Sequence, residues 1–394
     1  MNYIIFDDAS RDSLKPLTYI RPVCEIRVGI LTIREKWEKY LGCKTSTLTE
    51  DYLSEKYPIE LSDSMILING SVCPTDSIIE KVKALQPHQT LIVGDNIIAM
   101  HKTKDEFLSD EAEISERIDI GNIDYIQIVN PWDIFVMNER AINDDFVLIT
   151  KGRKSAPISE SNKVICPERI FIEEGATVEC ATLNAREGVI YIGKDAEIME
   201  NSVVRGPFAM CEHSVLKLSA KIYGATTLGP YSKVGGELAN VVILGYSNKA
   251  HDGFMGNSVI GEWCNIGADT NASNLKNTYE EVRLWSIAQN TFIPTGQTFC
   301  GTIMADHAKC GINTMFNTGT IVGVSSNVFG HGYQRNFIPS FVWGGQSGLK
   351  IYDFDKAVDV ARRMYMRREM TFSDIEERIL RNVFELTLKN KHLK

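Results

Sequence analysis

The stretches LGPYSKVG (residues 228–235) and IGEWCNIG (residues 260–267) decide the fold of the C-terminal part of this chain. In each stretch an aliphatic residue is followed by glycine, and the pattern returns six residues later. A six-residue period is typical of a hexapeptide β-helix, where each short strand points one aliphatic side chain inward and a small residue makes the turn. The same pairing recurs at Ile192-Gly193, Leu244-Gly245 and Val322-Gly323.

The extent of this pattern sets the size of the predicted β-helix. One strand cannot bury itself, so stability must come from stacked coils. About 180 residues at roughly 18 residues per coil predict about ten coils. A β-sandwich rich in turns is the alternative, and it is less favoured because sandwich strands do not recur every six residues. We therefore predict a left-handed parallel β-helix over residues 164–350.

The regions on either side of the repeats have different patterns of apolar and polar residues. Residues 1–150 alternate short apolar runs, such as Tyr3–Phe6 and Met65–Ile68, with helix-like segments, which predicts a Rossmann-like α/β domain. The polar stretch 151–163 reads as a linker. Residues 351–394 read as a helical tail, because apolar residues at three- and four-residue spacing follow the capping box Ser373-x-x-Glu376.

Composition limits the classes of function. The 394 residues carry a net charge of −9, with 44% apolar and 24% charged residues, as in a soluble globular protein. The acidic balance argues against nucleic acid and anionic membrane surfaces as partners. Nine cysteines without a Cys-x-x-Cys pair fit neither a zinc cage nor a disulfide framework. Because no signal peptide or membrane-length apolar run is visible, we expect a cytoplasmic protein.

The segment SNKAHDGFMGNSVIGEWCNIGADT (residues 247–270), followed by Asn274, resembles a known acetyltransferase core. It is similar to the family of bifunctional N-acetylglucosamine-1-phosphate uridylyltransferase/glucosamine-1-phosphate acetyltransferases, in a register without gaps from His251 onward. The resemblance implies that His251 is the catalytic base, that Asn265 and Asn274 contact the sugar or acetyl-CoA, and that Lys249 also binds substrate. Upstream, the segment GGELAN (residues 235–240) resembles a further family segment and implies Glu237 as a sugar ligand.

Two positions depart from this family. Its conserved tyrosine falls on Phe254, and the tyrosine after the second asparagine falls on Leu275. Both changes remove a hydroxyl group from the implied sugar-phosphate pocket. The identity of the sugar therefore stays open.

The segment DDASRDSLKPLTYIRP (residues 7–22) resembles the opening of sugar-phosphate nucleotidyltransferases. The Leu-x-Pro-Leu-Thr portion is intact, and Arg11, Lys15 and Arg21 stand where cations that bind phosphate are expected. The glycine-rich turn that normally brings backbone N–H groups to a triphosphate is missing.

The metal-binding motif of that family is also altered. Where the family has an aspartate that binds Mg²⁺, this chain has Ser71. The candidate replacements are Asn69 as a substrate contact, with Asp133 and Asn138 as metal ligands.

Nearly the whole chain resembles an alternative type of this bifunctional enzyme, which carries NTGTIVGVSSNVFG (residues 317–330) as a further motif. The resemblance implies acetyl transfer from acetyl-CoA to glucosamine 1-phosphate, then uridylyl transfer from UTP with Mg²⁺ and release of pyrophosphate. It also implies a homotrimer. An imidazole suits the acetyl transfer because its pKa is near neutrality. We expect His251 on an outer corner, because the inward positions of a β-helix are aliphatic.

Other functions remain open at this point. One is a nucleotidyltransferase alone, such as a glucose-1-phosphate thymidylyltransferase-like enzyme, with the β-helix as a trimerising scaffold. Another is a non-catalytic protein that binds sugar nucleotides, which the missing glycine turn, Ser71 and Phe254 favour. A zinc site of three histidines is disfavoured, because His251, His307 and His331 are too evenly scattered.

Overall fold

The computed structural model describes residues 2–109 and 115–389. The chain divides into two compact units. Unit 1 comprises Met1–Leu14, Ile20–Ile26 and Leu31–Asn130, and unit 2 comprises Lys15–Tyr19, Arg27–Ile30 and Pro131–Lys394. The division differs from the predicted boundary at residue 150, because residues 131–150 group with the β-helix.

Unit 1 is the predicted α/β domain, built around one six-stranded sheet. The strands β1, β2 and β3 are parallel, whereas β5 runs antiparallel to both β3 and β4, so the sheet is mixed. In spatial order the strands are β2 (Ser46–Leu48), β1 (Asn2–Phe6), β3 (Ser64–Asn69), β5 (Asn96–Thr103), β4 (Gln89–Val93) and β6 (Glu116–Asp119). The helices of this unit are α1 (Ser10–Ser13), α2 (Ile33–Leu41), α3 (Asp76–Ala84) and α4 (Lys104–Leu108).

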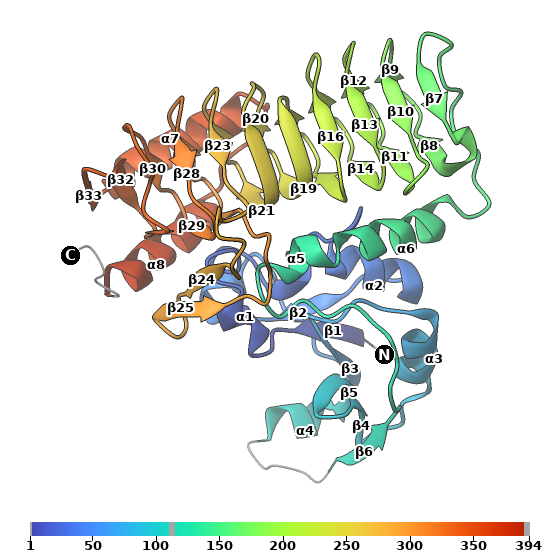
Figure 1. Cartoon of the computed structure of the whole chain (residues 1–394). Helices are drawn as coiled ribbons and strands as arrows, with labels where there is room; N and C mark the ends of the chain where they lie inside the picture. Colours follow the sequence, from blue (N-terminus) through green and yellow to red (C-terminus); the bar gives the residue numbers. More distant parts are fainter. Residues whose placement is uncertain (1, 110–114, 390–394) are drawn as a thin grey trace. The chain divides into compact units, whose positions relative to one another are not determined.

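Unit 2 contains the predicted parallel β-helix, whose coils stack along one axis (Figure 1). The strands form three columns, and the long strands β19 (Glu237–Gly245) and β21 (Phe254–Glu262) belong to both the first and the second column. The first column also has β7 (Lys163–Ile165), β10 (Thr182–Asn184), β13 (Val203–Arg205), β16 (Lys221–Tyr223), β23 (Asn271–Ala272) and β28 (Met315–Phe316). The second also has β8 (Ile170–Ile172), β11 (Ile190–Ile192), β14 (Phe208–Met210), β17 (Thr226–Leu228), β26 (Thr302–Met304), β29 (Thr320–Val322) and β31 (Phe337–Ile338).

The third column forms a ten-stranded sheet of its own. Its strands are β9 (Thr177–Val178), β12 (Glu197–Ile198), β15 (Val215–Leu216), β18 (Lys233–Val234), β20 (Asn248–Lys249), β22 (Asn265–Ile266), β27 (Lys309–Cys310), β30 (Asn327–Val328), β32 (Val342–Gly345) and β33 (Gly348–Ile351).

The register between coils shows how regular the repeat is. Phe208 pairs with Thr226, 18 positions on, as the predicted coil length requires. The separation rises to 44 positions between Val259 and Ile303, because an insertion leaves the coils there. The insertion contains a hairpin of β24 (Arg283–Ser286) and β25 (Thr291–Pro294). The sequence repeat predicts the coils but gives no sign of this hairpin.

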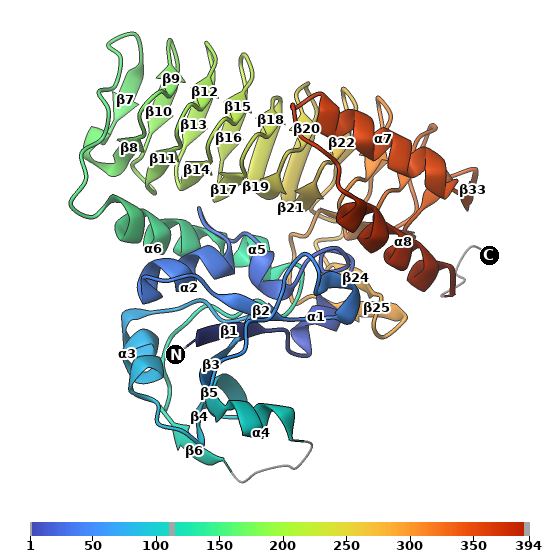
Figure 2. The same cartoon turned by 180° about the vertical axis from the view of Figure 1, so that it is seen from behind.

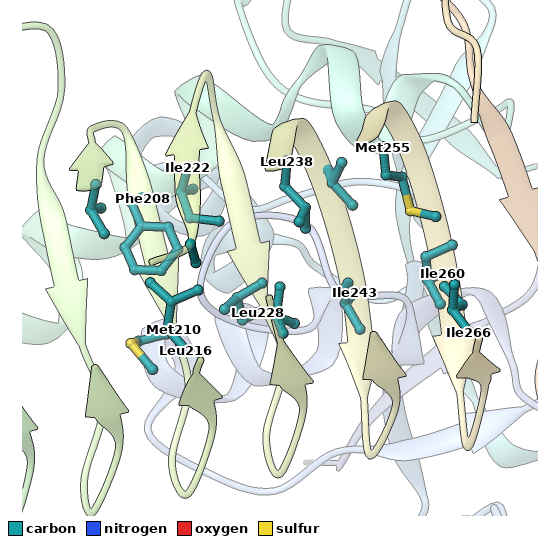
Figure 3. Close-up of a cluster of buried hydrophobic side chains, with 14 of the residues drawn as sticks. Phe208, Met210, Leu216, Ile222, Leu228, Leu238, Ile243, Met255, Ile260 and Ile266 are labelled. Atoms are coloured by element: carbon teal, nitrogen blue, oxygen red, sulfur yellow. The ribbon is translucent and has the colours of Figure 1, made fainter. Parts of the chain in front are cut away.

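The core of the β-helix is a stack of inward aliphatic and sulfur-containing side chains (Figure 3). Phe208, Leu216, Leu228 and Ile243 each expose no more than 1% of their surface. Burial of each such side chain contributes about 2 kcal/mol relative to exposure. Gly267 shows why the corners need small residues, because a Cβ there would lie 2.4 Å from the carbonyl carbon of Gly311.

The C-terminal helices α7 (Phe354–Met366) and α8 (Asp374–Lys389) lie alongside the coils of unit 2 (Figure 2). The ring of Tyr365 on α7 stacks on Trp263 at 3.9 Å. The predicted capping box is present, because the backbone N–H of Glu376 donates to Ser373 Oγ and that of Ser373 donates to the Glu376 carboxylate. Among the helices in the described ranges, none combines the length and the apolar character that a membrane span requires.

Two short helices, α5 (Asp133–Val136) and α6 (Asn138–Thr150), are anchored to the β-helix through one buried amide. Asn138 Nδ2 donates to the carbonyl oxygen of Ala225 at 2.9 Å, and its Oδ1 accepts from the Gly29 N–H and the Thr227 hydroxyl. These contacts explain why residues 27–30 and 131–150 group with the coils.

We expect Asn138→Ala to lower the free energy of unfolding of unit 2 by about 3 kcal/mol, because it leaves a buried N–H and a buried carbonyl without partners. Urea denaturation followed by circular dichroism measures the loss. Asn143→Ala is the matched control on the same helix, since Asn143 donates only to the Glu139 carbonyl in an exposed hydrogen bond. An equal loss in both variants would contradict the anchoring role of Asn138.

Candidate functional site

His251 lies at the corner between β20 and β21, where its side chain is exposed. The chain turns at Gly253, which has a φ of +114°, and a Cβ there would lie 2.2 Å from the carbonyl oxygen of Thr270. Close stacking on the next coil therefore requires glycine at this turn. The structure places His251 on the predicted outer corner, and its catalytic role stays a prediction.

The two predicted asparagines lie one coil further along. Asn265 Oδ1 accepts a hydrogen bond from Asn248 Nδ2 at 3.1 Å, and Asn274 Nδ2 donates to Asn257 Oδ1 at 2.8 Å. Asn265 belongs to the third column, next to the His251 corner, whereas Asn274 follows the first column at its other edge. The outer face of β21 thus runs from the His251 corner towards Asn274.

Phe254 and Gly256 lie on β21, between the His251 corner and Asn274. A Cβ at Gly256 would lie 2.4 Å from Asn274 Nδ2 and 2.8 Å from the Phe254 ring. Glycine therefore allows the phenyl ring and the amide to meet over this strand. The apolar ring occupies the place where the related family has a tyrosine.

Glu237 lies on the preceding coil, in register with Phe254. Its carboxylate accepts a hydrogen bond from the Tyr223 hydroxyl at 2.6 Å and pairs with Lys221 Nζ at 3.4 Å. The hydrogen bond to Glu237 raises the pKa of Tyr223 to about 12, and the same bond lowers the pKa of Glu237. Sequence reasoning missed Tyr223 and Lys221, because only the register between coils brings them to Glu237.

The surroundings of Lys249 differ from the prediction that it binds substrate. Its side chain is 2% exposed, and its ammonium group donates to the backbone carbonyls of Gly235, His251 and Asp252 at 3.1, 2.7 and 3.3 Å. An ammonium group that faces the backbone in this way does not fit a direct substrate contact. Burial lowers the pKa of Lys249 to about 8.

A cavity of about 530 Å³ opens where the insertion meets the later coils. Lys276 and Arg283 give it two cationic side chains, and Phe292 and Tyr333 give it two aromatic rings. Lys276 Nζ also donates to the Glu281 carbonyl at 2.7 Å. The sequence offered no signal for this cavity, because it depends on how the insertion folds back.

In unit 1, a cavity of about 380 Å³ lies at the carboxyl ends of β1 and β2. Arg11 lines it, but its guanidinium pairs with Asp7 at 2.9 Å and donates to the Arg21 carbonyl and the Tyr52 hydroxyl. Burial raises the pKa of Asp7, while Arg11 acts in the opposite direction. The charge of Arg11 is thus balanced within the protein, and the other charged lining residues are Asp8, Asp12, Glu50 and Asp51.

The other two predicted cations have different surroundings. Arg21 is buried in unit 1. Lys15 belongs to unit 2, where its ammonium group lies 5.7 Å from the centre of the Tyr19 ring. The phosphate-binding roles of Arg11, Lys15 and Arg21 stay predictions.

Asn69 and Ser71 both contact Asp8. Asn69 Nδ2 donates to Asp8 Oδ2 at 2.9 Å, and the Ser71 hydroxyl donates to the same oxygen at 3.2 Å. The other Asp8 oxygen accepts from the backbone N–H of Ser10. A carboxylate from the first loop thus lies beside the serine that replaces the family's aspartate.

One of the two predicted metal ligands does not fit a magnesium site. The side-chain amide of Asn138 is fully buried and is engaged with Gly29, Thr227 and Ala225, so it has a packing role. Asp133 lies at the start of α5, and its role as a ligand stays a prediction. Within residues 2–109 and 115–389, no three His, Cys, Asp or Glu side chains form a group suited to a metal ion.

Comparison with known proteins gives a match for the N-terminal region. Residues 3–154, less than half of the chain, match the family described as sugar nucleotidyl transferase. The cavity lined by Asp8 and Arg11 lies within the matched residues, at the sheet edge where α/β domains bind ligands.

A curated relative extends the comparison. A bifunctional sugar-1-phosphate nucleotidylyltransferase/acetyltransferase from Sulfurisphaera tokodaii is 26% identical over 145 residues, which cover 36% of this chain and 36% of the relative. The match thus spans about a third of that protein.

Solved structures also resemble the chain. One is AntD, an N-acyltransferase from Bacillus cereus in complex with dTDP-4-amino-4,6-dideoxyglucose and coenzyme A, with 13% identity, a TM-score of 0.25, and coverage of 53% of this chain and 91% of that one. Another is an Arabidopsis UDP-N-acetylglucosamine acyltransferase, with 15% identity, a TM-score of 0.27, and coverage of 60% and 98%.

The buried lysine predicts a specific pH dependence. The native pKa of Lys249, about 8, lies below its ordinary value of 10.5, so the unfolded chain binds more protons between these two pH values. Relative to Lys249→Met, the wild-type protein should gain up to about 3 kcal/mol of stability as pH rises from 7 to 10.5. Urea denaturation of both proteins at several pH values measures the difference, and a difference independent of pH would contradict burial of the ammonium group.

Proposed function

We propose that this chain is a bifunctional transferase of amino-sugar nucleotide synthesis. Its β-helix would transfer an acetyl group from acetyl-CoA to glucosamine 1-phosphate, and its N-terminal region would then transfer a uridylyl group from UTP and release pyrophosphate. The family match of residues 3–154 and the bifunctional relative support this pairing of activities. The observation that carries it is the exposed His251 at one edge of β21, with Asn265 and Asn274 one coil further along.

The acetyl transfer needs few groups from the protein. The sugar amine attacks the thioester carbonyl carbon, the new C–N bond forms, and the C–S bond breaks to release the thiolate of CoA. His251, acting as general base, takes the proton that the amine loses and returns it to the sulfur. Asn265 and Asn274 offer amide groups along the path of the sugar, and Glu237 offers a carboxylate to its hydroxyl groups.

The cavity beside the insertion suits the acyl donor. CoA carries phosphate groups and an adenine ring. In the cavity, Lys276 and Arg283 suit the phosphate groups. The rings of Phe292 and Tyr333 suit the adenine. Ser273, directly before Asn274, also lines the cavity, so the cavity lies next to one of the predicted sugar contacts. We propose this cavity as the place where the CoA nucleotide binds, in a protein that assembles as a homotrimer.

A second candidate for the N-terminal region is a domain that binds a sugar nucleotide without transferring a nucleotidyl group. The missing glycine-rich turn, and Ser71 in place of the family's aspartate, favour it. We assign no step to Mg²⁺, because Asn138 is engaged in packing and the described residues hold no group of three His, Cys, Asp or Glu side chains suited to a metal ion.

We expect His251→Ala to lower kcat for acetyl transfer at least about 100-fold, because it removes the general base. Release of free CoA thiol from acetyl-CoA and glucosamine 1-phosphate measures the rate. His213→Ala is the control, since His213 is another exposed corner histidine with a φ of +54°. Unchanged turnover in His251→Ala would remove this residue from the mechanism.

The same preparations test the N-terminal region. Pyrophosphate release from UTP and N-acetylglucosamine 1-phosphate should occur equally in the wild-type and His251→Ala proteins. Binding of UDP-N-acetylglucosamine without any pyrophosphate release would instead support the non-catalytic candidate.

The acyl-donor cavity makes a separate prediction. We expect the double substitution of Lys276 and Arg283 by Ala to raise KM for acetyl-CoA about tenfold or more, because two cations that face the phosphates are lost. The KM for glucosamine 1-phosphate should stay within about twofold. Lys233→Ala, at an exposed position of the third column, serves as the control for loss of positive charge. A larger effect on the sugar phosphate than on acetyl-CoA would place the donor elsewhere.

A further inference from the structure

Lys249 occupies a position that belongs to the core. In the third column, residues in register point inward from coil to coil, and Val234 pairs with Lys249 in this line. The line is otherwise apolar from one end to the other. Its members are Val178, Ile198, Leu216, Val234, Lys249, Ile266, Cys310, Val328 and Gly344.

A lysine in such a line carries a cost. Burial of its ammonium group disfavours the charged form, so the side chain weakens the fold unless its three N–H donors find acceptors. Here they find three backbone carbonyls, and two of these belong to His251 and Asp252. The third belongs to Gly235, on the coil before.

These hydrogen bonds connect the His251 corner to Gly235 on the previous coil. The shortest of the three bonds, at 2.7 Å, is the one to the carbonyl oxygen of His251 itself. The bond to Gly235 joins the same nitrogen to the previous coil, where a Cβ at Gly236 would lie 2.9 Å from the His251 carbonyl oxygen. Hydrogen bonds from a charged donor are stronger than neutral ones, so one buried group restrains the backbone that carries the imidazole.

We propose that Lys249 is a positioning residue, which holds the backbone of the His251 corner from inside the coil and so fixes where the imidazole stands. The inference rests on the proposed role of His251 as general base. A misplacement of about 1 Å at a reacting group can lower the rate about 100-fold. The gain in rate from this restraint can therefore offset the loss of stability that burial of the ammonium group causes. The role differs from the substrate contact that the sequence resemblance implied.

Lys249→Met tests the proposal, since methionine suits the apolar line and cannot donate to carbonyls. We expect kcat for acetyl transfer to fall 10- to 100-fold, with KM for glucosamine 1-phosphate within about twofold. A rise in KM with kcat retained would overturn the proposal in favour of a direct substrate contact. Lys249→Leu, which matches Leu216 of the same line, should give the same result and guards against failure of the methionine variant to fold.

The matched control is Lys309→Met. Lys309 Nζ donates to the carbonyl oxygen of His307 at 2.7 Å, and burial also lowers the pKa of Lys309 to about 8. This substitution removes an ammonium group that bonds to the carbonyl of His307 and not to the His251 corner, so kcat should stay within about twofold of the wild type. An equal fall of kcat in both variants would overturn a positioning role specific to Lys249.

A readout without activity separates this proposal from the proposed function. Amide hydrogen exchange, followed by mass spectrometry, should become about tenfold faster or more over residues 251–256 in Lys249→Met and stay unchanged in Lys309→Met. Unchanged exchange in Lys249→Met would overturn the restraint. Faster exchange, together with full activity of His251→Ala, would leave the restraint standing and refute the role of His251.

Discussion

The hydrogen-bonded stacking of parallel coils is the constraint on which the rest of the β-helix depends. The coil strands pair in parallel with the strands of the coils before and after them, as Phe208 does with Thr226, and side chains alternate between a closed interior and the outside. The interior admits aliphatic side chains at nearly every position, and the chemistry must therefore stand on the corners and outer faces. His251 stands on such a corner. Lys249 occupies an interior position, and its ammonium group donates to the backbone carbonyl of His251.

In the N-terminal region, the constraint is the charge of the loop that follows β1. A loop after the first strand of an α/β sheet must hold charged side chains close together, and here most of those charges are satisfied by one another. Asp7 balances Arg11, and Asp8 accepts hydrogen bonds from Asn69 and Ser71. A network of this kind keeps the loop in place without the glycine-rich turn that the resembled family carries.

The sequence predicts the parts of this protein that follow a period. The six-residue repeat gives the β-helix, and the motif around His251 places that residue at a turn, because the neighbouring inward positions are aliphatic. The repeat cannot show that Lys249 points inward, since a lysine is expected outside. Nor does spacing reveal that Asn138 anchors α6, because its partners Gly29 and Ala225 are distant from it in the sequence. The insertion and its cavity have no period, and so they could not be predicted.

A crystal structure of the protein with coenzyme A and glucosamine 1-phosphate tests the central claim most directly. The sugar amine should lie within about 3.2 Å of a ring nitrogen of His251, with the thiol of coenzyme A beside it and the Lys249 ammonium group still bonded to the His251 carbonyl. A sugar phosphate bound away from the outer face of β21, or a Lys249 side chain turned outward onto the phosphate, would contradict it.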